Sequence, residues 1–385
     1  MIITHVANVD TKSLGERIRA ARKRSGLSQD ELAREIGLDR SAVNRLEGGA
    51  RKVTALELSD IATAVGVRMS TFFEDPLPAL VSHRSSQGLD TADSKIDALL
   101  AKLADEVEFI NSLDSTVLGL HGADAIAQAK CSPPSTNSEA EALAARARDM
   151  MGLEAEASIL RLSEDVAKIG LLAFSRDIGK DTADAGTILL RRGAVALINS
   201  HLKVGHRRLA LAHELGHYLI ADDYTVDWRV AGHSDQTVPM ESRLDRFART
   251  LLLPGPMLVR KWPELVERLG ERAAAIALAS EFRVNMATLA ARLNDAGLAD
   301  QDTIAVVRML RTTKADMVEL GLFVPLEELL GNTVPQPFSR AVLKLVRDER
   351  ISHERALDLL QGTFSDTDLP INRERRADEI WKYVW

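Results

Sequence analysis

The sequence predicts a mainly α-helical protein with a small β-sheet, an α+β fold. Aromatic residues are only 4% of the 385 residues, whereas alanine, leucine and arginine are abundant, which favours helices over sheets. Apolar residues recur at helical spacing over most of the chain. The exceptions are four short runs rich in β-prone residues, all between positions 157 and 199. A chain of this length is expected to form two or three domains.

Positions 12–75 predict an N-terminal domain of five short helices. Ser28 and Glu31 have the spacing of a capping box that starts the second helix, and Asp39 can cap the third. Two helices joined by a tight turn within 29–47 have the layout of a helix-turn-helix motif. The first helix before this motif and two shorter helices after it complete the predicted domain.

The charge of the chain is unevenly distributed. The segment Lys12–Lys52 holds 11 Lys and Arg against 6 Asp and Glu, a net charge of +5. The formal net charge of the whole chain is −7, so the rest carries −12. A basic N-terminal domain on an acidic body indicates that this domain meets an anionic partner.

Positions 76–136 are interpreted as a linker that contains one long helix, at about 92–113. Prolines at its start mark a boundary. Ile96, Leu103 and Ile110 repeat every seven residues within an apolar stripe of this helix. The repeat permits a short coiled coil, and so a dimerisation element. Packing of the stripe onto the body of the same chain is an equally good interpretation.

Positions 137–300 predict one further domain. It starts with a helix at about 139–151, and its short strands are expected at 157–161, 170–174, 186–190 and 194–199, joined by hairpin-type connections. Further helices are expected to begin near His206, Met240, Glu264 and Met286. Positions 301–385 predict a separate α-rich C-terminal segment whose role the sequence does not indicate.

The helix expected from His206 carries the sequence His213-Glu214-Leu215-Gly216-His217. Residues at i and i+4 lie one turn apart on the same face of a helix, so the two imidazoles can bind one tetrahedral zinc ion. Glu214 would lie beside the same ion and act as the general base that takes a proton from water. Two surface histidines at this spacing are the alternative, but the preceding helix is apolar, which favours a buried site.

A third ligand is expected further along the chain. Glu241 begins an amphipathic helix, and Asp245 follows it by one turn. Glu241 would then bind the zinc ion, and Asp245 would accept a hydrogen bond from a histidine that binds it. Surface charges on this helix are one alternative, and His233 in an expected loop is a rival third ligand. The single cysteine, Cys131, excludes a site built from cysteines.

These residues resemble the ImmA/IrrE family of metallopeptidases. The resemblance covers roughly 137–300 and rests on the HELGH sequence, on Glu241-x-x-x-Asp245-x-Phe-Ala and on the Leu-Leu-Leu-Pro that follows. The order of elements is also similar to that of gluzincins. The resemblance implies His213, His217 and Glu241 as zinc ligands, Glu214 as catalytic residue and Asp245 as support for a ligand histidine. Leu244 departs from the pattern, in which a small residue is more common.

The N-terminal domain resembles the Cro/C1-type, or XRE-like, repressor domain, through the sequence from Leu27 to Gly49. The resemblance implies that the third helix enters the major groove of an operator in double-stranded DNA, because arginine can bond guanine edges there. Flanking basic residues would contact phosphates. A domain kept only for protein contacts is the alternative. The expected DNA-binding residues are Gln29, Arg40, Ser41, Asn44, Arg45, Arg51 and Lys52.

Together, these features predict a DNA-binding regulator with a zinc endopeptidase domain. The ImmA/IrrE resemblance implies cleavage of a regulatory protein such as a repressor, in a stress or mobile-element response. Cleavage of the chain itself, in the linker, is a further hypothesis. The alternative function is an autoregulator or antitoxin whose peptidase-like domain mainly binds a partner protein or ligand, and an adjacent toxin-like gene would favour it.

The sequence also predicts the setting in which the protein works. It contains no apolar run near 18 residues and no signal pattern, so we expect a cytoplasmic protein that does not contact the membrane. One cysteine fits a reducing compartment. Repressor domains of this kind bind as dimers on two half-sites, so we also expect a homodimer.

Overall fold

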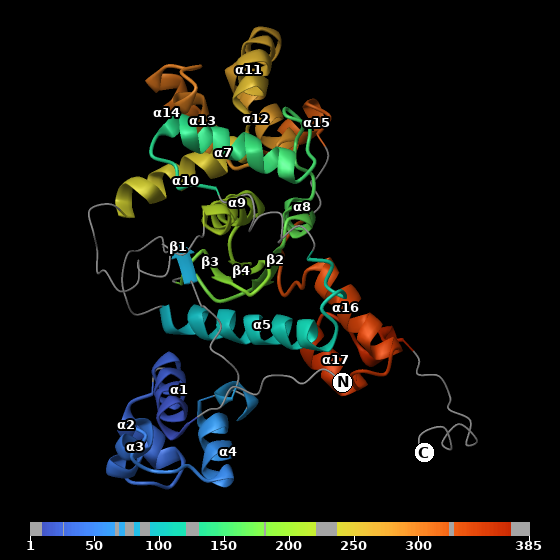
Figure 1. Cartoon of the computed structure of the whole chain (residues 1–385). Coiled ribbons are helices and arrows are strands. Elements are labelled where there is room, and N and C mark those ends of the chain that lie inside the picture. The colour runs from blue at the N-terminus through green and yellow to red at the C-terminus, as the bar shows by residue number, and fades with distance from the viewer. Residues whose placement is uncertain are drawn as a thin grey trace, which may run out of the picture.

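The structure, a computed structural model, describes residues 10–25, 27–65, 69–73, 81–84, 93–120, 131–180, 182–220, 237–322 and 327–370. It confirms a mainly α-helical fold with one small sheet (Figure 1). The N-terminal helices form one body, and the sheet lies between two groups of helices, one with a long helix and two C-terminal helices, the other with most of the remaining helices. Within these residues, no helix is both long and apolar enough to cross a membrane.

The N-terminal domain contains the expected five helices. They are α1 (Thr11–Arg24), α2 (Gln29–Glu35), α3 (Arg40–Glu47), α4 (Ala55–Ala64) and the 3₁₀ helix η1 (Met69–Phe72). The capping box at Ser28 and the Asp39 cap are both present, since each side-chain oxygen accepts a hydrogen bond from the first turn of its helix. Gly37 has a φ of +67°, the left-handed conformation that lets the chain turn between α2 and α3.

A buried ion pair holds the helices of this domain together, in addition to its apolar core. Glu47 is buried at the end of α3, and its carboxylate accepts hydrogen bonds from Arg22 of α1 at 2.5 and 3.1 Å. Gln29 of α2 donates a third hydrogen bond to it at 2.8 Å. These polar contacts therefore connect α1, α2 and α3 around one carboxylate, whose pKa is lowered by the arginine and glutamine against the opposing effect of burial.

The sheet has four strands, in the order β1-β3-β4-β2. The strands are β1 (Val81–Arg84), β2 (Leu171–Arg176), β3 (Ala185–Leu189) and β4 (Ala194–Asn199). Strands β3 and β4 form the expected hairpin, but β2 pairs in parallel with β4, so hairpin connections throughout were the wrong prediction. The antiparallel partner of β3 on its other side is β1, which comes from the segment interpreted as a linker.

The two faces of the sheet differ in the size of their side chains. The face toward α9 (Val204–Ile220) is rich in alanine, at positions 173, 185, 194 and 196. The opposite face carries larger residues such as Leu172, Phe174 and Leu197. Alternation along each strand produces this difference. It lets α9 approach its face of the sheet closely, while the other face forms a thicker apolar layer.

The long helix α5 (Asp93–Leu113) covers the face with the larger residues (Figure 1). Its stripe residues Ile96, Leu103 and Ile110 are buried in the same core as the sheet. The structure therefore shows the stripe packed onto the chain's own body. Two C-terminal helices, α16 (Gln336–Arg347) and α17 (His353–Leu360), complete this core, and the short 3₁₀ helix η3 (Asp366–Asp368) follows them.

Beyond α9 lies a larger group of helices that shares its core (Figure 1). The helix expected from Glu264 begins earlier, at Gly255, and includes Pro263. The members of the group are α7 (Asn137–Met150), α8 (Leu162–Lys168), α10 (Thr237–Leu252), α11 (Gly255–Leu269), α12 (Glu271–Glu281), α13 (Met286–Asp295) and α14 (Gln301–Met309). The short helix α15 (Lys314–Glu319) follows them and has no buried residue.

The strand predicted at 157–161 is not formed. This segment is irregular, and its carbonyl groups accept hydrogen bonds from arginine side chains instead of from a neighbouring strand. Arg208 donates to the carbonyl of Ile159 at 2.6 Å, and Arg148 donates to that of Ala157. Because distant arginines satisfy the backbone, the β-prone composition of the segment does not decide its structure.

The segment 327–333, called the arm below, precedes α16 in the chain and is fixed to α9 and to the sheet. Arg208 of α9 is fully buried and pairs with Glu328, which also accepts hydrogen bonds from Ser163. Thr333 forms an isolated antiparallel bridge with Ser175, at the outer edge of β2. Through this arm and through α16 and α17, residues beyond position 301 contribute to the apolar cores on both sides of the sheet.

Candidate metal centre and DNA-facing helix

Helix α9 presents the HELGH residues at its buried interface with β3 and α10. His213 and Glu214 are 1% and 0% exposed, so these groups do not lie on a solvated surface. Gly216 faces α10, where an added Cβ would lie 3.0 Å from Phe247 and 3.1 Å from Leu244. The glycine therefore allows the close packing of α9 on α10. Leu244, the departure from the family pattern, fills the space beside it.

Three potential metal ligands converge between α9 and α10. The two histidine Nε2 atoms lie 3.1 Å apart, and Glu241 places its carboxylate oxygens 3.1 Å from His213 and 3.5 Å from His217. These three residues form the group of His and carboxylate side chains, among those that the structure describes, that could hold a metal ion. His233, the rival third ligand, lies outside the described residues.

The spacing of these atoms fits zinc. Tetrahedral zinc has bonds of about 2.0–2.2 Å to nitrogen and oxygen, so its ligand atoms lie roughly 3.3–3.6 Å from one another. The distances of 3.1 to 3.5 Å in this cluster are close to that range. Two imidazoles with one carboxylate also match the donor set of catalytic zinc sites, which leave a fourth position open.

Glu214 lies beside this cluster but is held by the sheet. The hydroxyl of Thr187, on β3, donates a hydrogen bond to Glu214 Oε2 at 2.7 Å. The other oxygen, Oε1, is buried and has no hydrogen-bond partner among the described residues. Burial raises the pKa of Glu214, while the two histidines and Thr187 act in the opposite direction. One oxygen is thus fixed and the other remains able to accept a proton.

Asp245 supports His213 from the side opposite Glu241. Its Oδ1 lies 2.9 Å from His213 Nδ1, so Nε2 is the nitrogen directed at the cluster. Burial opposes protonation of His213, but hydrogen bonds with Asp245 and Glu241 outweigh burial and raise its pKa to about 9. The same histidines lower the pKa of Glu241 despite its burial. In the metal-free chain, His213 therefore carries a proton at neutral pH, and this positive charge lies where a metal ion would bind.

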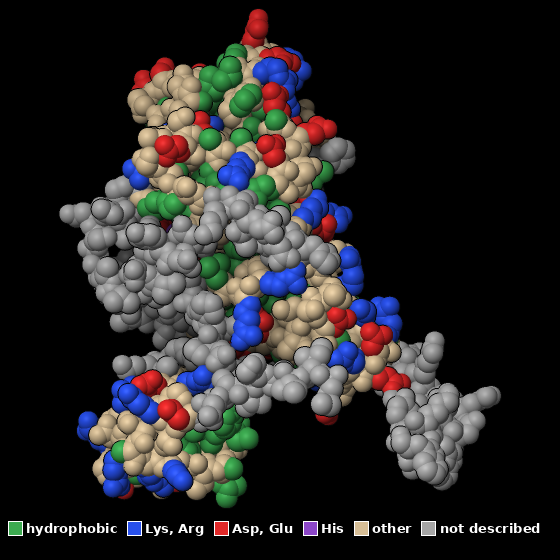
Figure 2. All heavy atoms as spheres, viewed as in Figure 1, with side chains coloured by type: hydrophobic (Ala, Val, Ile, Leu, Met, Phe, Trp, Pro, Cys, Tyr) green, Lys and Arg blue, Asp and Glu red, His purple; other side chains and the backbone are tan. Residues whose placement is uncertain are grey.

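On the N-terminal domain, α3 exposes one polar face. Arg40, Ser41, Asn44 and Arg45 are all exposed, at the spacing of a single helical face, and Lys52 is exposed beyond the helix. The opposite face, with Val43 and Leu46, is buried in the domain core. Side chains of Lys and Arg are prominent over this domain (Figure 2). The exposed face of α3 is therefore accessible to a groove of double-stranded DNA.

Other residues of the expected DNA-binding set already have partners within the domain. Gln29 donates to Glu47 and lies 3.5 Å from Asn44. Arg51 donates to Glu57 at 2.6 Å. The Ser41 hydroxyl donates to the Asp39 cap at 2.6 Å, and Arg40 lies 3.3 Å from Asp30. Gln29 and Arg51 are thus held in place by carboxylates, which the sequence pattern alone did not indicate.

Thr187 and the Arg22–Glu47 pair are functional or structural residues that the sequence analysis missed. Thr187 is an ordinary strand residue, and no local signal connects it with Glu214. Glu47 was expected only as the last residue of a helix. A carboxylate on the buried face of that helix, four residues after Val43, was the available signal, because such a group requires a cationic partner.

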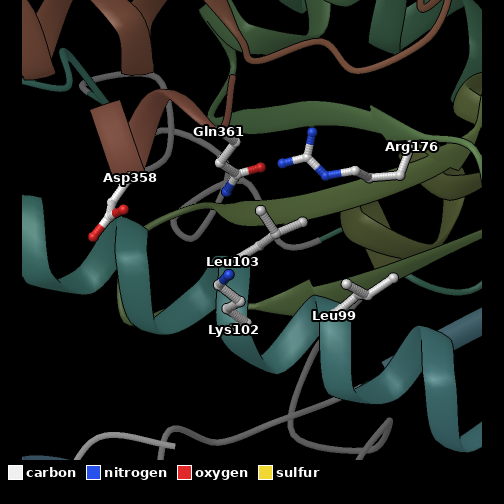
Figure 3. Close-up of a pocket in the computed structure, with 6 residues that line it drawn as sticks. All are labelled: Leu99, Lys102, Leu103, Arg176, Asp358 and Gln361. Atoms are coloured by element: carbon white, nitrogen blue, oxygen red, sulfur yellow. The ribbon is translucent and has the colours of Figure 1, made fainter. Parts of the chain in front are cut away.

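A separate small cavity lies on the other side of the sheet, between α5 and α17 (Figure 3). Its volume is about 120 Å³, and its polar lining includes Lys102, Arg176 and Gln361. Arg176 extends into it from the end of β2, toward the amide of Gln361. The cavity has no histidine in its lining and belongs to the core on the α5 side, so it is distinct from the metal cluster.

Family models match two segments of the chain. The model described as "Helix-turn-helix" matches residues 18–72. The model described as "IrrE N-terminal-like domain", of peptidase family M78, matches residues 168–294, which include the cluster and Glu214. The chain therefore belongs to the XRE-type helix-turn-helix proteins and joins such a domain to an IrrE-like domain.

Curated relatives match the helix-turn-helix segment. An uncharacterized transcriptional regulator in the ATPase CF(0) region of Rhodospirillum rubrum is 37% identical over 62 residues, 16% of this chain and 57% of that protein. An uncharacterized HTH-type transcriptional regulator of Sinorhizobium medicae is 36% identical over 16% of this chain and 45% of its own length. The chain thus spans about half the length of these relatives.

A control protein and a controller protein are also similar to part of the chain. Control protein C.MunI of a Mycoplasma species is 34% identical over 16% of this chain and 84% of its own length. The crystal structure of the restriction-modification controller protein C.AhdI from Aeromonas hydrophila is 38% identical over 16% of this chain and 96% of that chain, with a TM-score of 0.16.

Proposed function

We propose that this chain is a DNA-binding transcriptional regulator whose IrrE-like domain is a zinc-dependent endopeptidase acting on a regulatory protein, such as a repressor. The observation that carries the proposal is the convergence of His213, His217 and Glu241 beside a buried glutamate that is not part of the ligand set. A site built only for structure would need no such additional carboxylate.

The residues of the chain have separate roles in this proposal. His213, His217 and Glu241 hold the metal, and Asp245 orients the ring of His213. A bound zinc ion supplies Lewis acidity, which lowers the pKa of water and polarises a peptide carbonyl. Glu214 would accept a proton at its unpartnered Oε1 from the water whose oxygen bonds to the peptide carbonyl carbon, and would pass that proton to the amine nitrogen as the C–N bond breaks. Thr187 keeps the other oxygen in place and leaves Oε1 available for this proton.

Metal analysis and a search for cleaved proteins test the proposal. We expect one zinc ion per chain in the wild type and in Glu214→Gln, and its loss in Glu241→Ala. Wild-type protein incubated with an extract of its own cells should create new N-termini in a DNA-binding regulator, and Glu214→Gln should not. Absence of bound metal, or identical N-termini with both proteins, would refute the proposal.

A second candidate function is an autoregulator or antitoxin whose IrrE-like domain binds a partner. The observation that favours it is the complete burial of Glu214, together with the occupation of the neighbouring sheet edge by β1. Under this alternative, Glu214→Gln would leave the transcriptional output unchanged. The endopeptidase proposal requires the output to change, so one reporter measurement separates the two functions.

The N-terminal domain is proposed to bind an operator in double-stranded DNA through the exposed face of α3. Arg45 faces base edges, whereas Lys52 contacts phosphate. In a gel-shift assay with DNA from upstream of its own coding sequence, Arg45→Ala should weaken binding by about 1–3 kcal/mol and relax specificity. Lys52→Ala should weaken binding to all sequences and reduce the dependence on salt. Unchanged binding by both variants would contradict this assignment.

A homodimer is proposed to form through the N-terminal domains. Leu56 on α4 is 80% exposed, and Met69 and Phe73 near η1 are also exposed, which gives this domain an apolar patch (Figure 2). The stripe of α5 is covered by the chain's own core and does not compete for this role. Leu56→Glu should convert dimers to monomers in sedimentation velocity. A wild-type chain that sediments as a monomer would refute it.

A further inference from the structure

Strand β1 has an unusual origin for its position. Its residues Val81–Arg84 follow the N-terminal domain in the chain, yet they pair with β3 in the sheet of the IrrE-like domain (Figure 1). The register places Ser82 opposite Thr187 and Arg84 opposite Ala185. Because β1 is the last strand on its side of the sheet, β3 would be an edge strand without it.

This edge of the sheet is the one nearest to the proposed catalytic residues. Thr187, the partner of Ser82 in the register, donates its hydroxyl to Glu214. Strand β1 also lies in contact with α9, the helix that carries His213 and His217. Adjacent strands lie about 4.8 Å apart, so a backbone paired with Thr187 passes directly beside the site.

The opposite edge of the sheet is not an equivalent surface. Strand β2 forms that edge, and it is partly covered by the bridge between Ser175 and Thr333. The arm that carries Thr333 is anchored by Glu328, which pairs with the buried Arg208. One edge of the sheet is therefore closed by an anchored arm, and the other by a strand of four residues.

We propose that the edge of β3 is the binding surface for an extended polypeptide segment, and that β1 occupies it as an internal competitor. This inference rests on the proposed endopeptidase function. An unpaired edge strand binds an extended peptide through its backbone groups, with little demand on sequence. A substrate segment therefore has to displace β1 before its backbone reaches Glu214. The strand lies between the DNA-binding domain and α5, so displacement changes the connection between the two domains.

A peptide-binding measurement tests this inference without metal or hydrolysis. The probe is a fluorescent peptide with the sequence of Ala79–Ser86, and all chains carry Glu214→Gln and are kept metal-free. One chain has an intact β1, and the other carries Ser82→Pro and His83→Pro, which remove two backbone donors from the strand. A peptide with the same two prolines is the matched control.

We expect the peptide to bind the proline-substituted chain, and to bind the intact chain at least about tenfold more weakly. The reason is that the apparent affinity falls in proportion to the fraction of chains in which β1 leaves the edge of β3 free. The proline peptide should bind neither chain. Equal affinity for both chains, or no binding to the opened chain, would overturn the inference. Failure of the endopeptidase proposal, through absent zinc or absent cleavage, would leave this result unchanged.

A second variant guards against misfolding of the proline chain. It replaces Val81–Arg84 by Gly-Ser-Gly-Ser, which keeps the length and lowers strand propensity. Hydrogen exchange of residues 185–189 should be faster in this variant and slow again when peptide is added. Unchanged exchange would show that β1 does not protect β3. A cut within 81–84 after zinc is added to the wild type would show a substrate instead of a stable competitor, and would also overturn the inference.

Discussion

Replacement of Thr187 by valine should loosen the proposed catalytic residue without removing any metal ligand. The threonine hydroxyl donates to Glu214 Oε2 at 2.7 Å, and Glu214 is completely buried with its other oxygen unpartnered. A hydrogen bond to a charged group contributes about 1.5–3 kcal/mol. Because Glu214 is 0% exposed, bulk solvent does not replace the hydroxyl at Oε2, so most of that free energy should be lost from the local stability of α9.

Hydrogen exchange of α9 measures this loss directly, since it reports the free energy of local opening. In metal-free protein at a pH above the raised pKa of Glu214, Thr187→Val should make exchange across Val204–Ile220 about tenfold to a hundredfold faster, at roughly 1.4 kcal/mol per factor of ten. Thr187→Ser keeps the hydroxyl and should restore most of the protection. The effect should shrink as the pH falls through the raised pKa of Glu214, because a hydrogen bond to the protonated acid is weaker.

Thr250→Val is the matched control for this experiment. Thr250 lies on α10 and is buried like Thr187, but its hydroxyl has no hydrogen-bond partner among the described residues. Its replacement should therefore be close to neutral. If Thr187→Val accelerates exchange of α9 no more than Thr250→Val does, the hydrogen bond from β3 to Glu214 does not stabilise the site and the reasoning fails.

Three further predictions concern metal binding and the N-terminal domain. Asp245→Asn should weaken zinc binding by about 10- to 100-fold in a chelator competition, although no ligand is lost; an unchanged affinity would exclude its orienting role. Zinc affinity should rise with pH and level off near pH 9. The reason is that hydrogen bonds raise the pKa of His213 to about 9, so below that pH zinc has to displace a proton from this histidine. Calorimetry in two buffers should detect the released proton, and an affinity independent of pH would contradict this. Arg22→Met should destabilise the N-terminal domain by about 3–5 kcal/mol in thermal melts, and adding Glu47→Leu should recover most of this loss. Equal melting temperatures of the single and double variants would argue against a buried ion pair.

Local sequence signals predicted the local features of the fold well. The caps at Ser28 and Asp39 are decided by residues within one helical turn, and both are present in the structure. The i, i+4 spacing of His213 and His217 likewise fixes their common direction on α9. Convergence with Glu241 was expected because Glu241 and Asp245 share one face of a second helix, and the structure brings all four side chains together.

Features that depend on distant partners could not be predicted in the same way. The segment 157–161 has the composition of a strand, but arginines from far along the chain bind its carbonyls. Conversely, Val81–Arg84 was taken for linker, and only the available edge of β3 makes it a strand. The heptad repeat of α5 fits a partner helix and its own sheet equally well, because either surface buries the same stripe.

The alanines that line the sheet beneath α9 determine which substitutions the site can tolerate. Ala196 is fully buried on β4, and its neighbour across the pair is Thr187. A valine at this position adds two methyl groups where the interior is close-packed, so the helix has to move away from the sheet. A movement of about 1 Å would break the hydrogen bond of 2.7 Å between Thr187 and Glu214. A search for inactive variants that considers only polar residues would overlook such positions. The size of these apolar side chains determines the distance between α9, which carries the two histidines, and the sheet.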